Sequence, residues 1–137
     1  MRKIMRAAAA LALGTATALA GVALAGGVPV ETATLDGAKV TLHVYPFLDA
    51  TELATLRLVM TNSSARSLFL PDHTGYAAIA VAPDEGFIRG GKPIASASAL
   101  SGLPDAKAAA SKALATCDTA RRASGQGCVV VLELGPA

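Results

Sequence analysis

The sequence predicts an α+β fold, with a mostly antiparallel sheet of four or five strands, two helices packed on one face, and one disulfide. Three observations support this fold class. Asp36-Gly37 separates two segments in which apolar and polar residues alternate, a pattern typical of a β-hairpin with a tight turn. Residues 104–123 carry small apolar side chains at helical spacing, and an almost continuous apolar run begins at Cys128, as expected of a helix followed by a buried strand.

Residues 1–25 have the pattern of a secretory signal peptide. Three basic residues within the first six precede a long uncharged stretch, like the basic and apolar regions of such a signal. The small residues that signal peptidase requires occur before Gly26, where we expect cleavage after Ala25, and again at Ala20, which stays an alternative. Residues 26–137 then form a single small α+β domain.

The apolar stretch is a poor membrane anchor, because it is mostly Ala, Gly and Thr and no second basic flank follows it. We therefore expect no stable membrane insertion after processing, and a periplasmic or secreted protein. The chain has 12 Lys and Arg against 10 Asp and Glu. Three of the cations lie in the signal peptide, so the processed domain is close to neutral, which argues against nucleic-acid binding.

Two cysteines, Cys117 and Cys128, are the only ones in the chain. An oxidising compartment favours their pairing. Cys117 lies on the inward face of the predicted helix, and Cys128 opens the strand that returns beneath it. Their spacing is not that of a redox Cys-x-x-Cys motif, and no second pair completes a zinc site, so we predict a structural disulfide.

The first half of the domain begins with the hairpin, whose outward face we expect to be polar. Asp49 and Glu52 stand at the spacing of a capping box, which predicts a helix over residues 50–61. Residues 56–61 also alternate, so a strand stays open there. We interpret residues 62–75 as irregular.

The middle of the domain begins with residues 76–82, which are apolar on both faces and predict a central strand. A turn at 83–86 follows. A less regular strand is expected within residues 87–98, interrupted at Gly90-Gly91. The final strand is predicted over residues 128–134.

The Tyr76–Ala82 segment, the Ala-Leu-x2-Cys pattern that ends at Cys117 and the Cys-led final strand together resemble a class of small exported bacterial domains of unknown function. The whole domain is similar to a narrower family of short secreted bacterial proteins, through Pro46-Phe47-Leu48, residues 52–57 and the Cys117-Asp118 segment. The resemblance implies a secreted domain of unknown function.

Some members of that family carry the label 5-aminolevulinic acid synthase. Enzymes of that class need a large fold that binds pyridoxal phosphate, with a Schiff-base lysine. The processed chain is far too short for such a fold, and its four lysines lie in polar contexts by pattern. We therefore expect no cofactor.

Candidate catalytic and binding groups are few. His43 lies on the outward face of the hairpin, and Asp72-His73 would need a serine from the Ser63-Ser64 turn to form an acid–base set. Gly90-Gly91-Lys92 lacks the Walker spacing and is interpreted as an exposed hairpin turn. The Arg121-Arg122 pair is expected to interact with the carbonyl end of the last helix, and Asp84-Glu85 to lie in a surface loop. No catalytic residue or metal site is predicted.

Three classes of function stay open: a binding or interaction module with a periplasmic protein as its partner, a structural or envelope-stress accessory protein, and an enzyme. Small disulfide-closed domains without a catalytic set usually act through their surfaces, so we favour the binding module. It would require an exposed apolar or aromatic patch. The aromatic residues able to form one are Tyr45, Phe47, Phe69, Tyr76 and Phe87.

Overall fold

The computed structural model describes residues 22–25 and 27–137 of the chain. The predicted signal peptide and its Ala25–Gly26 cleavage site therefore lie largely outside the described residues. The fold is α+β and built on an antiparallel sheet, which confirms the predicted fold class. Five strands form the body of the sheet, and a short strand, β1, adds to its edge. In spatial order the strands are β1 (Val22–Ala25), β2 (Val28–Leu35), β3 (Ala38–His43), β8 (Val129–Pro136), β4 (Tyr76–Val81) and β7 (Ser98–Leu103).

The predicted hairpin is formed by β2 and β3, with Leu35 opposite Ala38. Asp36 and Gly37 make the two-residue turn at φ angles of 55° and 75°, values that a tight hairpin turn needs and that asparagine, aspartate and glycine tolerate best. One face of the hairpin is buried through Val40 and Leu42. The other face is polar and exposed at Thr32, Thr34 and Lys39, as expected.

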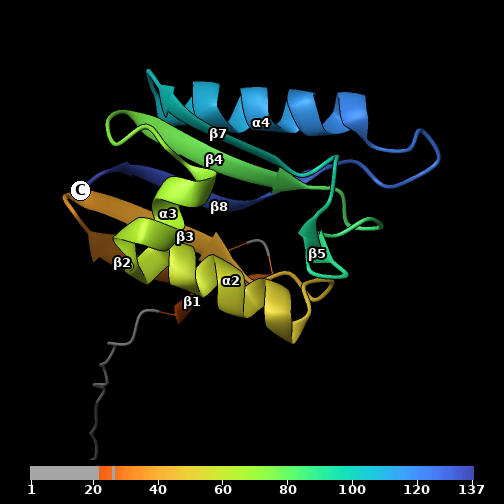
Figure 1. Ribbon diagram of the computed structural model, residues 1–137, viewed down its shortest axis with the longest axis horizontal. Coiled ribbons are helices and arrows are strands. Elements are labelled where there is room, and N and C mark those ends of the chain that lie inside the picture. Colours follow the sequence, from red (N-terminus) through yellow and green to blue (C-terminus); the bar gives the residue numbers. More distant parts are fainter. Residues whose placement is uncertain (1–21, 26) are drawn as a thin grey trace, which may run out of the picture.

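The helices lie on opposite faces of the sheet, which corrects the prediction that both pack on one face (Figure 1). The physical reason is the interior strand β4, which lies between β8 and β7 and is apolar on both faces. Ala77, Ile79 and Val81 join the core beneath α2 (Ala50–Thr61), whereas Ala78 and Ala80 join a second cluster beneath α4 (Ala106–Ala120). A strand that is apolar on both sides must be covered on both sides.

Helix α2 begins at the predicted capping box: the Asp49 side chain accepts the Glu52 N–H at 2.8 Å, and the Glu52 carboxylate accepts the Asp49 N–H at 2.9 Å. The helix runs to Thr61, so residues 56–61 are helical rather than extended. Its buried residues Leu56, Val59 and Met60 pack on the sheet.

The segment expected to be irregular contains a second helix, α3 (Ser63–Phe69). The Asn62 side chain caps it by accepting the Ala65 N–H at 2.9 Å. Arg66 of α3 is buried and donates to the last carbonyls of α2, Val59 at 3.2 Å and Met60 at 3.0 Å. Sequence reasoning missed α3 because a seven-residue helix is too short to show a periodic pattern.

The predicted helix over residues 104–123 is α4, whose buried stripe consists of Ala109, Ala113 and Cys117. Its small side chains face the alanines of β4, so helix and sheet approach closely. The interrupted strand of residues 87–98 is a small separate hairpin, β5 (Ile88–Arg89) and β6 (Lys92–Pro93). Among the described residues, no helix has both the length and the hydropathy needed to cross a membrane.

Candidate functional site

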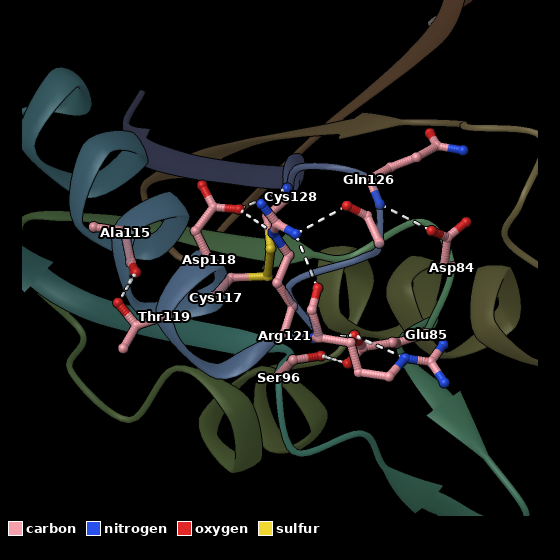
Figure 2. A network of polar contacts seen from close by, with 12 residues as sticks. Asp84, Glu85, Ser96, Ala115, Cys117, Asp118, Thr119, Arg121, Gln126 and Cys128 are labelled. Carbon is pink, nitrogen blue, oxygen red and sulfur yellow. Dashed lines mark hydrogen bonds and ion pairs between the residues drawn. A yellow bond between two sulfur atoms is a disulfide. The ribbon is translucent and has the colours of Figure 1, made fainter.

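The disulfide joins Cys117 of α4 to Cys128, just before β8, with a Cα–Cα separation of 6.1 Å. This confirms the predicted pairing. Cys117 is completely buried in the alanine-rich cluster beneath α4. The bond ties the helix to the strand that returns beneath it, and the intervening loop, residues 121–127, is held at one end of the sheet (Figure 2).

A carboxylate and a guanidinium fix this loop from the helix side. Asp118 Oδ1 accepts the backbone N–H of Cys128 at 2.9 Å and the Nε–H of Arg121 at 2.7 Å. These two hydrogen bonds lower the pKa of Asp118, the bond from Cys128 having the larger effect. Arg121 also donates to the carbonyl of Gly125 at 2.9 Å. Arg121 therefore braces the loop, and its side chain bonds Asp118 and loop carbonyls rather than the carbonyl end of the helix that the sequence predicted.

Two further carboxylates, from the turn after β4, hold the loop from the other side. Asp84 accepts the Gln126 N–H at 2.9 Å, and Glu85 accepts the Arg122 N–H at 2.7 Å (Figure 2). Glu85 also accepts the Ser96 hydroxyl at 2.6 Å, which is the largest of the effects that lower its pKa. Sequence reasoning placed Asp84-Glu85 in a surface loop but gave no sign of these distant partners.

A groove of about 360 Å³ opens beside this braced loop. Three loops meet there because β3 and β4 end, and β8 begins, at the same end of the sheet, with Val81 opposite Val129. The rings of Tyr45 and Phe47 stack with centroids 5.4 Å apart. The residues that line the groove are Tyr45, Pro46, Phe47, Pro83, Asp84, Gln126 and Val129.

Of the five aromatic residues considered from the sequence, two line this groove and three do not. Phe87 is buried and lies 5.5 Å from Phe69, centroid to centroid, in the main core. Tyr76 packs against the cluster beneath α4. Tyr45 and Phe47 are half-buried, so their rings contribute both to the core and to the groove.

Neither of the two histidines lines this groove. His43 Nε2 is 2.7 Å from a carboxylate oxygen of Glu133 on β8. His73 lines a cavity of about 50 Å³ together with Ser63 and Asp72, so the structure does bring the three residues of the considered acid–base set to one place. However, Ser63 and Asp72 form their hydrogen bonds with residues outside this set. The Ser63 hydroxyl donates to Asp36, and Asp72 accepts the Ser101 hydroxyl at 3.0 Å.

Gly90 and Gly91 form the turn between β5 and β6 at φ angles of 61° and 77°, so this segment is an exposed hairpin turn as predicted. Within residues 22–25 and 27–137, no group of three or more His, Cys, Asp or Glu side chains is arranged to hold a metal ion.

Comparison with protein-family models, curated proteins and solved structures finds no match to this chain. The groove lined by Tyr45 and Phe47 therefore rests on its own geometry and chemistry as the candidate functional site.

Proposed function

We propose that this chain is an exported, non-catalytic binding module, and that the groove lined by Tyr45 and Phe47 is its binding surface. The observation that carries the proposal is a stacked aromatic pair that lines a groove of about 360 Å³, to which the braced loop contributes Gln126. Aromatic rings beside a concave surface are typical of sites that bind through apolar contact with a few directing polar groups.

The lining suits an extended peptide that carries proline and a basic residue. Two rings and two prolines offer flat apolar surface, the kind of groove that recognises polyproline segments. Asp84 is exposed at the same groove, so its carboxylate favours a cationic side chain. We expect the ligand to be a segment of a periplasmic protein.

The braced loop supports this function because hydrogen bonds and the disulfide already hold it in place without a ligand. The disulfide, Asp118, Asp84 and Glu85 each hold one part of residues 121–128. Binding to a wall that is already ordered costs less conformational entropy than binding to a mobile loop.

The disulfide also supports an oxidising location, because such bonds persist in exported proteins and are rare in the cytosol. The resemblance to small exported bacterial domains agrees with this proposal.

The test is a titration of the isotopically labelled chain with a synthetic peptide, Pro-Pro-Leu-Pro-Arg, followed by amide chemical shifts. We expect saturable shifts at Phe47, Gln126 and Val129. Phe47→Leu should abolish them, whereas Phe69→Leu, a matched change in the core, should leave binding intact. Asp84→Asn keeps an oxygen for the Gln126 N–H and should weaken binding by about threefold to fivefold, as expected for loss of an exposed ion pair.

Shifts spread evenly over the surface, or equal binding by both phenylalanine variants, would contradict this assignment. The structural accessory function would then be the better interpretation.

A further inference from the structure

We propose that the outer edge of β2 is a strand-accepting site for an extended, uncharged apolar peptide segment, and that β1 occupies part of it in this structure. The site is separate from the groove at Tyr45 and Phe47, with which it shares no lining residue. We call it the β2 edge site and define it by strand β2 and the facing side of α2 (Figure 1).

The backbone of β2 carries the first part of the argument. The Pro29 carbonyl points toward the β3 side of the strand, where it accepts the N–H of Val44, the residue after β3, at 2.8 Å. Because alternate residues of a strand bond to opposite sides, Val30, Thr32 and Thr34 turn their backbone groups to the outer edge. Such an edge can bind an added strand through main-chain hydrogen bonds.

The segment seated on the edge shows that it accepts a strand. β1 pairs antiparallel with β2, from Val22 opposite Glu31 to Ala25 opposite Val28. It uses only half of β2, which runs to Leu35. Within the part of the chain that the structure describes, no strand lies opposite residues 32–35 on this edge.

A groove of about 430 Å³ runs between this edge and α2. Leu58, on the α2 side of this groove, has 51% of its surface exposed. Among the described residues, Leu68 is the other large apolar residue that is exposed. The residues that line the groove are Glu31, Thr32, Ala33, Ala54, Arg57, Leu58, Met60 and Thr61.

The chemistry of the groove specifies the occupant. Every second side chain of an added strand would face α2, toward Ala33, Ala54 and Leu58, which suits small or medium apolar residues. Arg57 and Glu31 form a two-bond ion pair, at 3.0 and 2.7 Å, so neither selects a charge on the ligand. The sequence of β1, Val-Ala-Leu-Ala, is itself short, apolar and uncharged.

Processing of the chain would decide whether the site is free. Cleavage after Ala25, as the sequence predicts, removes all of β1 and leaves the edge open, whereas cleavage after Ala20 retains it. Where β1 is retained, it occupies this part of the edge until a partner segment displaces it.

The test uses the full-length chain and a fluorescent peptide with the sequence of residues 21–26, Gly-Val-Ala-Leu-Ala-Gly. In the variant Ala23→Pro, β1 loses a ladder donor and should detach. We expect this variant to bind the peptide at least tenfold more tightly than the unaltered chain, where β1 competes at high effective concentration. Adding Leu58→Asp should abolish binding, while Leu68→Asp, a matched change of the other exposed leucine on α3, should not.

A second measurement does not depend on that variant. In the labelled, unaltered chain, excess peptide should shift the amides of Thr32 and Thr34 and leave the opposite sheet edge, β7, unchanged. Equal binding with and without Ala23→Pro, equal shifts at both edges, or insensitivity to Leu58→Asp would overturn the proposal. Dimerisation of the Ala23→Pro variant in place of peptide binding would also overturn it and assign the edge to a second copy of the chain.

Discussion

The Glu52 carboxylate of α2 accepts the backbone N–H of Phe87 at 2.6 Å, although the two residues are 35 positions apart in the chain. The same oxygen accepts the N–H of Ile88 at 2.8 Å, and the other accepts the N–H of Asp49 at 2.9 Å. The Arg89 guanidinium lies 3.4 Å away. Glu52 is fully buried, so one capping residue also anchors the segment that leads into β5.

Glu52→Gln should destabilise the fold by about 3 kcal/mol, because the amide keeps only one accepting oxygen. Its nitrogen must face either the N–H of Asp49 or the N–H groups of Phe87 and Ile88, and buried unsatisfied groups are costly. Asp49→Ala is the matched control, since it removes only the ordinary cap and should cost about 1 kcal/mol. Urea denaturation measures both. Equal losses would show that the second carboxylate oxygen of Glu52 contributes no more than an ordinary helix cap.

Removing the disulfide by Cys117→Ala with Cys128→Ala should lower stability by about 3 kcal/mol, the chain-entropy value for a loop of this size. In a domain of about 110 residues this is a fall in melting temperature of roughly 10–20 °C. Calorimetry of the unaltered chain with and without reductant checks it. The double variant should not respond to reductant, and an unchanged melting curve would refute the stabilising role.

Arg66→Lys should destabilise by about 2 kcal/mol, because one ammonium group cannot replace three directed donors. The guanidinium bonds the carbonyls of Val59, Met60 and Leu35, the last at 3.0 Å. Arg57→Lys is the control: its ion pair with Glu31 is on the surface and should be worth under about 1 kcal/mol. Similar losses in the two variants, measured by urea denaturation, would contradict the capping role of Arg66.

Stability should fall as the solution is acidified. Hydrogen bonds lower the pKa of Glu85 and Asp118 below their ordinary values of 4.5 and 3.8. A carboxyl group with a lowered pKa in the folded state stabilises the fold fully above its unfolded pKa, and this contribution is lost as pH falls through the folded pKa. We expect a plateau down to about pH 5 and a decline below it. Glu85→Gln with Asp118→Asn should make the decline shallower, which thermal melts at pH 3 to 7 would measure.

The exported protein should have an intact mass that matches Gly26 to Ala137, less two hydrogens for the disulfide, and should resist thiol alkylation under denaturing conditions. Mass spectrometry of the protein recovered from the periplasm checks all three points together. A mass that begins at Gly21 would assign cleavage to Ala20 and retain β1. A full-length, alkylatable chain would refute export.

Much of the fold follows from interactions between residues that are close together in the sequence. The Asp36-Gly37 turn, the capping box of Asp49 and Glu52, and the small-residue stripe of α4 each depend on residues a few positions apart, so the sequence predicted them correctly. α3 was missed because its seven residues are too few for a period to show.

By itself, then, the sequence determined the α+β class, the hairpin, the long helices and the cysteine pairing, since backbone preference and solvent exposure act on neighbouring residues. Only the tertiary structure decided that α2 and α4 cover opposite faces of β4, that Glu52 bonds Phe87, and that Tyr45 and Phe47 share a groove with Gln126. Each of these joins residues far apart in the chain. Their proximity follows from strand order and packing, which no local pattern encodes.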